Sequence, residues 1–175
     1  FRRLPLGREN PHAMTLSQLG ALVRYARRYH VAIMPEIECW GHAASILHHY
    51  PELHGGPGMW GGKSFGLGPE TFDLFEKIFD ELVPVLERKC LVHVGLDEAI
   101  WATLKSVPPS RRADFSPATL VGRLHAILER AGRKHGREVT MHLWADHGGR
   151  PIPPALTDKV VVEPWMYFEA RADDI

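Results

Sequence analysis

Apolar residues recur at helical spacing in three stretches of the chain. In the first, Leu19, Leu22, Val23 and Ala26 follow Thr15 and Gln18, a pair that predicts an N-terminal capping box. The other two stretches cover residues 69–86 and 116–135, and each has a proline in its first turn. Proline at the start of an apolar stripe is typical of an amphipathic helix, so we expect three helices, the last ending at Gly132 and Gly136.

Short, almost continuous apolar runs lie between and after these helices. They cover residues 31–37, 91–95, 139–144 and 159–162, and polar residues gather at the far end of each run. Runs of this kind are typical of parallel strands that are buried on both faces. Strands that alternate with helices indicate parallel pairing through helical crossovers, and ligands of such folds bind at the carboxyl ends of the strands.

The predicted fold class is α/β, a partial TIM (β/α)8 barrel with about four parallel strands. Acidic, histidine or tryptophan residues follow four predicted strands in succession, and no glycine-rich phosphate motif follows any of them. This pattern favours the mouth of a barrel over the single ligand site of an open sheet. A complete barrel needs about 250 residues and eight strands, whereas this chain has 175 residues. We therefore expect the rest of the barrel to come from missing sequence or from another chain. Residues 54–68 are expected to form a long glycine-rich loop.

The charge balance argues against two classes of partner. Lysine and arginine together number 21, as do aspartate and glutamate, so no field of one sign attracts nucleic acid or a membrane surface. No apolar run is long enough to span a bilayer. Cys39 and Cys90 are predicted at opposite ends of neighbouring strands, so we expect no disulfide between them, and the residues leave the compartment open.

The adjacent carboxylates Asp97 and Glu98 directly follow the second predicted strand. Mutual repulsion and partial burial would raise the pKa of one of them, and a carboxyl group that stays protonated near neutral pH can act as a general acid. The same pair is also common at the N-cap of a helix. The spacing alone leaves both interpretations open.

Five segments together resemble one enzyme family. Residues 93–98, His-Val-Gly-Leu-Asp-Glu, resemble the His-x-Gly-Gly-Asp-Glu signature of glycoside hydrolase family 20, the β-N-acetylhexosaminidases. Residues 35–42 resemble that family's Pro-Glu-Ile-Asp-x-Pro-Gly-His segment, and residues 67–70 its Leu-Asn-Pro stretch. Residues 143–146 and 161–165 are similar to its Gly-Trp-Asp-Glu and Val-x-x-Trp strand ends. The matches occur in family order, so the resemblance implies that residues 1–175 form about strands three to six of the catalytic barrel.

The resemblance implies hydrolysis of terminal β-linked N-acetylhexosamine, either GlcNAc or GalNAc, with retention and with the substrate's acetamido oxygen as nucleophile. Glu98 would protonate the leaving oxygen and later deprotonate water, while Asp97 would hold and polarise the acetamido N–H. His42 would tune the acid, and Trp144 and Trp165 would wall the acetamido pocket. Asp146 would bind a sugar hydroxyl or cap a helix. No cofactor or metal is implied, and the family suggests a secreted or periplasmic location.

Several departures from the family pattern mark a divergent member. Leu96 replaces a glycine and adds bulk before the catalytic pair, Trp40 replaces a proline and is expected to narrow the mouth, and Glu38 replaces an aspartate. His147 follows Asp146 where Asp-Glu is usual. These changes put the preference for N-acetylglucosamine in question. A chain of only these residues is expected to be inactive by itself.

Three alternatives stay open at this point. The first is a carbohydrate-binding relative without catalysis, and the second is a soluble α/β domain with charged strand ends. The third is a metal-dependent barrel hydrolase, although no compact ligand motif appears in the sequence. Its candidate ligands are Glu36, Glu38, His42, His93, His142, Asp146 and His147.

Overall fold

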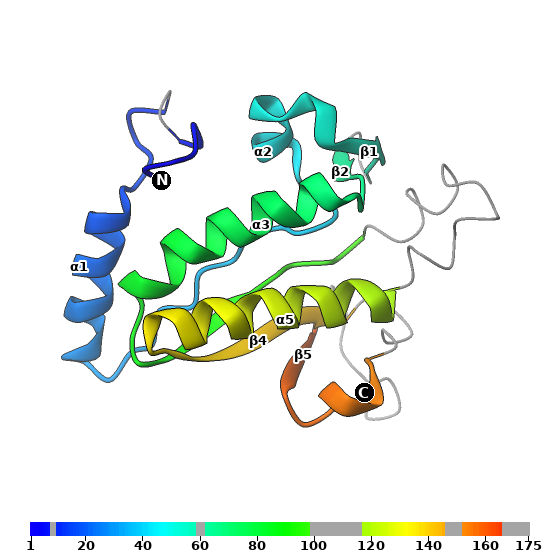
Figure 1. The fold of residues 1–175 in the computed structure, drawn as a ribbon. Coiled ribbons are helices and arrows are strands. Elements are labelled where there is room, and N and C mark those ends of the chain that lie inside the picture. Colours follow the sequence, from blue (N-terminus) through cyan, green and yellow to red (C-terminus); the bar gives the residue numbers. More distant parts are fainter. Residues whose placement is uncertain (8–9, 59–61, 99–116, 146–151, 166–175) are drawn as a thin grey trace.

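The computed structural model describes residues 1–7, 10–58, 62–98, 117–145 and 152–165. Figure 1 shows α3 and α5 running side by side across the sheet, with α2 and a small hairpin at one end and α1 at the other. The helices are α1 (Leu16–Arg27), α2 (Ala44–His49), α3 (Pro69–Leu82) and α5 (Pro117–His135), with short 3-10 turns at Pro51–Leu53, Val83–Val85 and Pro154–Leu156. The strands are β1 (His54–Pro57), β2 (Lys63–Phe65), β3 (Lys89–His93), β4 (Glu138–Ala145) and β5 (Val160–Pro164).

The predicted capping box at the start of α1 is confirmed. The Thr15 side chain accepts from the backbone N–H of Gln18 at 3.2 Å, and the Gln18 side chain accepts from the backbone N–H of Thr15 at 2.8 Å. Both otherwise unpaired donors of the first turn thus have partners. The stripe on this helix is only partly buried, because Val23 and Ala26 face the core while Leu22 is exposed.

The main sheet has the order β3-β4-β5 and all its pairs are parallel. Val92 pairs with Met141, and Leu143 pairs with Val162. α5 connects β3 to β4, whereas the described residues between β4 and β5 contain only a 3-10 turn. The predicted α/β class, with parallel strands and helical crossovers, is confirmed.

The first predicted strand, over residues 31–37, is not a strand in the structure. The segment runs beside β3, where His93 donates to the carbonyl of Pro35 at 3.0 Å and Ile37 donates to the carbonyl of His93 at 2.9 Å. Only one isolated bridge forms, between Glu36 and His93. Pro35 has no N–H to offer to a ladder, so pairing in this segment stays limited to its carboxyl end.

The predicted glycine-rich loop over residues 54–68 contains a hairpin instead. β1 and β2 pair antiparallel, with an irregularity between His54 and Gly56. The backbone of Gly55 lies against that of Gly66, so closely that a Cβ on Gly55 would be 2.3 Å from the Gly66 nitrogen. The glycines that suggested a loop therefore permit close contact between the two strands.

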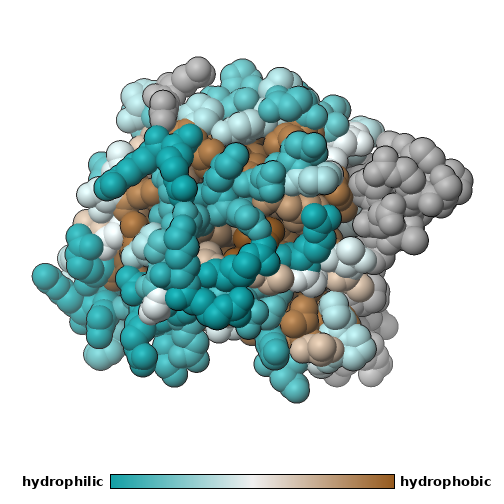
Figure 2. All heavy atoms as spheres, viewed as in Figure 1, coloured by the Kyte–Doolittle hydropathy of each residue, from teal (hydrophilic) through white to brown (hydrophobic). Residues whose placement is uncertain are grey.

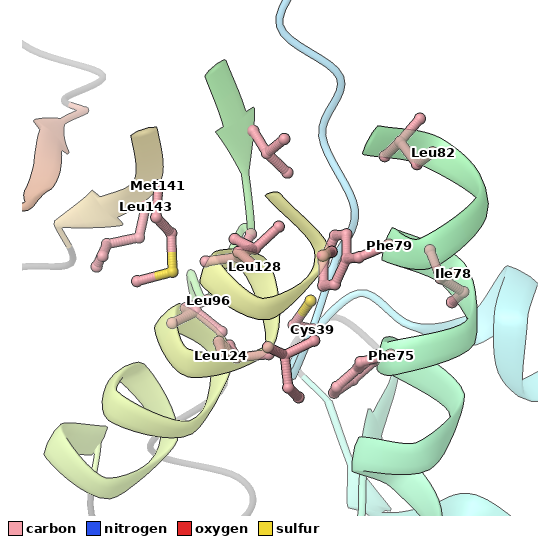
Figure 3. Close-up of a cluster of buried hydrophobic side chains, with 14 of the residues drawn as sticks. Cys39, Phe75, Ile78, Phe79, Leu82, Leu96, Leu124, Leu128, Met141 and Leu143 are labelled. Atoms are coloured by element: carbon pink, nitrogen blue, oxygen red, sulfur yellow. The ribbon is translucent and has the colours of Figure 1, made fainter. Parts of the chain in front are cut away.

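The hydrophobic core lies between the sheet and the pair α3 and α5. Figure 3 shows side chains from both helices meeting those of β4. The predicted apolar stripes of both helices are confirmed as buried. Gly132 does not end α5, which continues to His135. A Cβ at Gly132 would lie 2.8 Å from the carbonyl oxygen of Arg137, so glycine lets the chain pass close to the helix. Fully buried members of the core include Phe75, Ile78, Phe79, Leu124, Leu128, Met141 and Leu143.

The surface over α3 and α5 is mostly hydrophilic, and apolar residues show only in the gaps between polar ones (Figure 2). Within the described ranges, no helix has the length and apolar character needed to cross a membrane. Cys39 and Cys90 are both free and buried, in agreement with the expected absence of a disulfide between them.

Candidate active site

The chain leaves β3 through a turn with an unusual backbone. Gly95, Leu96 and Glu98 have positive φ angles of 66°, 80° and 49°. The backbone N–H of Trp144 donates to the carbonyl of Gly95 at 3.1 Å, which ties this turn to the next strand. Left-handed backbone costs a non-glycine residue about 1–2 kcal/mol, and such strain clusters at functional sites. The turn places Asp97 and Glu98 at the carboxyl end of the sheet.

His42 meets both carboxylates of this pair. Its Nε2 atom lies 3.2 Å from Oε2 of Glu98 and 3.4 Å from Oδ2 of Asp97. His42 lies in the segment before α2, and its backbone also has a positive φ, 47°. Its side chain is 36% exposed, whereas those of Asp97 and Glu98 are 19% and 16% exposed, so the three groups form a half-open site. Residues from separate parts of the sequence are thus brought together as the resemblance implied.

Trp144, at the end of β4, is held by two residues of the neighbouring segments. Its indole N–H donates to Oε1 of Glu36 at 2.7 Å, and its ring lies 4.4 Å from that of His93. Trp165 directly follows β5 and is half-buried, at the same edge of the parallel sheet. Asp146 lies outside the described residues. The structure therefore places both tryptophans at the carboxyl edge, with the indole of Trp144 fixed in orientation.

His93 is a buried imidazole at the end of β3. The backbone N–H of Gly95 donates to its Nδ1 at 3.0 Å, so in the neutral ring the proton sits on Nε2. Burial lowers the pKa of His93, although the Glu36 carboxylate 3.2 Å away opposes this. Next to it on β4, Nδ1 of His142 lies 2.6 Å from Oε1 of Glu163. These residues form a polar layer on the face of the sheet away from the helices.

Glu38 also lies at the site, although the sequence suggested it only as a departure from the family pattern and as a ligand in the metal-dependent alternative. Burial, together with the nearby charges of Asp97 and Glu36, raises its pKa to about 9. The sequence argument expected a raised pKa within the Asp97–Glu98 pair, and for that pair it stays a prediction. The available signal was spacing, because Glu36 and Glu38 lie two residues apart at the end of one extended segment.

Comparison with known proteins identifies the family. The model of the glycosyl hydrolase family 20 catalytic domain matches residues 7–172. The chain belongs to glycosyl hydrolase family 20. A curated relative, beta-hexosaminidase subunit A2 of Dictyostelium discoideum, is 32% identical over 100 residues, which cover 54% of this chain and 18% of the relative.

Solved structures of family 20 enzymes contain the same fold. The chitobiase of Flavobacterium johnsoniae aligns with a TM-score of 0.68 at 21% identity, over 90% of this chain and 25% of that one. A beta-N-acetylhexosaminidase aligns with a TM-score of 0.56 at 22% identity, over 77% of this chain and 31% of that one. The chain thus spans less than a third of each of these relatives and corresponds to part of their fold.

Two departures from the family 20 pattern act in the core and not at the mouth. Leu96 is 1% exposed and belongs to the same buried apolar cluster as Leu124 of α5 (Figure 3), so its side chain contributes to the core. Trp40 is completely buried in the same core, so the expectation that it narrows the mouth is wrong. Its carbonyl accepts from the N–H of Phe65 at 2.9 Å, which anchors the hairpin.

The metal-dependent alternative finds no support in its own residues. Of its seven candidates, only His42 belongs to a compact group of three potential ligands within the described ranges, and the other two members are Asp97 and Glu98. Glu36, His93 and His142 are engaged with tryptophan, backbone or carboxylate partners instead. Asp146 and His147 lie outside the described residues.

Proposed function

We propose that the protein hydrolyses terminal β-linked N-acetylhexosamine residues, with retention and by substrate assistance. The observation that carries this proposal is the single imidazole nitrogen of His42, which lies within 3.4 Å of both Asp97 and Glu98. Because both carboxylates reach the same atom, they lie on one side of any bound sugar. A retaining mechanism with two carboxylates needs them on opposite faces of the scissile bond, so neither fits the role of nucleophile.

Each residue then has a separate task. Glu98 donates its proton to the leaving oxygen and afterwards takes one from water, and His42, at 3.2 Å, stabilises its anionic form in between. Asp97 accepts a hydrogen bond from the acetamido N–H and stabilises the positive charge that develops when the acetamido oxygen attacks. Trp144 and Trp165 would pack against the acetamido methyl group.

The remaining strands of the barrel must cover the edge of this sheet at β5. Val161 and Val162 of β5 are 41% and 36% exposed, which is unusual for apolar residues in a parallel sheet. We infer that further barrel strands, from elsewhere in the protein, lie against them. The activity belongs to that complete barrel, so its tests need the full-length protein.

The first test compares two chromogenic substrates with the same leaving group. The full-length protein should cleave nitrophenyl N-acetyl-β-glucosaminide and leave nitrophenyl β-glucoside intact, because only the first carries its own nucleophile. Equal cleavage of both would contradict substrate assistance. If the folded protein bound the acetamido sugar and cleaved neither substrate, the binding-only alternative would replace this proposal.

Asp97→Asn separates the roles of the two carboxylates. Loss of its charge should lower kcat on the acetamido substrate by about 10²–10³-fold, the range for removing one preorganised electrostatic group. Any residual cleavage of the plain glucoside should not change. A matched control is Asp158→Asn, which makes the same substitution at an exposed position before β5.

A further inference from the structure

The carboxyl group of Glu38 lies against the backbone of the turn over residues 95–98, here called the catalytic turn. A Cβ placed on Gly95 would be 2.1 Å from Oε2 of Glu38 and 2.4 Å from its Cδ, so only glycine leaves room for it. The side chain reaches this position from the segment beside β3. Because Gly95 immediately precedes Leu96 and Asp97, a group fixed at this point acts on the geometry of the catalytic pair.

Glu38 and Asp97 each have a buried carboxyl oxygen that no donor satisfies. Oε2 of Glu38 and Oδ1 of Asp97 are both buried, and neither has a hydrogen-bond partner. The two carboxyl groups are nevertheless within hydrogen-bonding reach. Two ionised carboxylates only accept, so this contact becomes a hydrogen bond only when one of them carries a proton.

The surroundings decide which carboxyl group keeps that proton. Among the described residues, the charged groups that act most strongly on Glu38 are Asp97 and Glu36, which are both acidic, while the backbone N–H of Leu96 acts in the opposite direction. Asp97 has the imidazole of His42 at 3.4 Å from its other oxygen, Oδ2, so a potential donor already faces this carboxyl group. The proton therefore belongs on Glu38.

We propose that Glu38 is a neutral carboxylic acid in the working enzyme and a positioning residue that donates a hydrogen bond to Oδ1 of Asp97. This inference rests on the role of Asp97 in the proposed function. The hydrogen bond fixes the carboxylate plane of Asp97, so that Oδ2, the oxygen beside His42, is held in place to accept from the acetamido N–H. The negative charge stays on Asp97, where the reaction uses it.

Burial and the neighbouring charge of Asp97 raise the pKa of Glu38 to about 9, in agreement with a neutral group at pH 7. Above about pH 9, Glu38 would ionise, and its repulsion of Asp97 and Glu36 would disturb the turn. The pattern resembles other enzyme sites in which one of two neighbouring carboxyl groups is kept protonated so that it can donate.

The first measurement does not depend on activity. Infrared spectra of the full-length protein at neutral pH should contain the carbonyl stretching band of a protonated carboxyl group, which stands apart from carboxylate absorption. Glu38→Gln should remove the part of that band that comes from Glu38 and leave any contribution of the general acid Glu98, whereas the control Glu52→Gln, at an exposed position, should retain the band unchanged. An identical band in wild type and Glu38→Gln would overturn the proposal, whatever the enzyme's substrate.

The second measurement tests positioning with kcat on nitrophenyl N-acetyl-β-glucosaminide as a function of pH. Glu38→Gln keeps a neutral donor and should retain kcat near neutral pH, with less decline on the alkaline side than wild type. Glu38→Met fills similar space without a donor and should lose about tenfold, the equivalent of one net hydrogen bond. Equal losses in both variants would reduce Glu38 to a packing residue. If wild type itself cleaves nothing, the proposed function fails while the infrared result still stands.

Discussion

The two faces of the β3-β4-β5 sheet differ in what they demand of the sequence. The face toward α3 and α5 carries Val92, Met141 and Leu143, all at most 1% exposed. The opposite face carries His93, His142, Trp144 and Glu163 on the same strands, in alternation with the first set. Side-chain volume and buried apolar area determine the first face, whereas individual hydrogen-bond donors, acceptors and charges determine the second.

This difference separates stability from chemistry. Apolar packing is non-directional, so the helix-facing side tolerates exchange among residues of similar volume. The polar side depends on directional contacts such as the hydrogen bond from the Trp144 indole N–H to Glu36, which needs a donor and an acceptor at fixed positions. Substitutions on the two sides should therefore fail in different assays, and the predictions below test that separation.

The largest effect is expected for Glu98→Gln in the full-length protein. Loss of a general acid typically costs 10²–10⁴-fold in rate, and kcat on substrates with poor leaving groups should fall by that much. Aryl glycosides with good leaving groups need less protonation and should suffer less. The unfolding free energy should change little. Equal loss of kcat on both kinds of substrate would count against Glu98 as the acid.

A core substitution should show the reverse behaviour. Leu124→Ala, at a completely buried position on α5, should lower the unfolding free energy by about 2–5 kcal/mol through lost burial and a cavity. Below the unfolding transition, kcat should stay near the wild-type value. Urea denaturation measures the first effect, with Leu22→Ala as control, because Leu22 is 38% exposed and should change stability by less than about 0.5 kcal/mol. Similar losses in both variants would refute the assignment of the core.

The helix-facing side could be predicted from the pattern of apolar residues alone. The stripes of α3 and α5 were correct because burial of one helical face imposes a period that the sequence displays directly. The pattern failed over residues 31–37, where an apolar run suggested a strand but Pro35 limits pairing. It also failed at residues 54–65, where glycines indicate a loop but serve close strand contact.

The arrangement of residues on the polar side could be predicted only from sequence motifs. The contact of His42 with Asp97 and Glu98 joins residues more than 50 positions apart, and no local pattern announces it. Resemblance to a family supplied that link. It did not supply the role of Glu38, because the raised pKa depends on burial by the turn at Gly95 and Leu96, and only the three-dimensional arrangement shows that burial.

The buried carboxyl group of Glu38 on the polar side should also make the free energy of unfolding depend on pH. Glu38 has a pKa of about 9 in the folded state against 4.5 ordinarily, so between these values the folded protein holds a proton that the unfolded chain releases. Stability must therefore fall as pH rises through this window, by at most roughly 1.4 kcal/mol per pH unit from this group. Glu38→Gln removes that dependence and should gain stability over wild type as pH increases.

Denaturant titrations of wild type and Glu38→Gln at several pH values between 5 and 9 would measure this gain. Glu52→Gln is the control, since an exposed carboxylate should give a difference that is nearly constant over the same range. A constant difference for Glu38→Gln as well would mean that Glu38 is ionised in the folded protein.

The smallest effect concerns Leu96, where the two sides of the sheet meet. Its side chain belongs to the apolar core, but its backbone belongs to the catalytic turn and has a φ of 80°. Both Leu96→Ala and Leu96→Gly remove the buried side chain and should destabilise the fold. Ordinarily glycine is less stable than alanine by about 0.5–1 kcal/mol, whereas a left-handed backbone costs a residue with a Cβ about 1–2 kcal/mol. We therefore expect Leu96→Gly to be more stable than Leu96→Ala, by up to about 1 kcal/mol in urea denaturation. The usual order, with alanine the more stable, would show that the turn relaxes when leucine is removed, and that packing of Leu96 against α5 holds the backbone in its strained form.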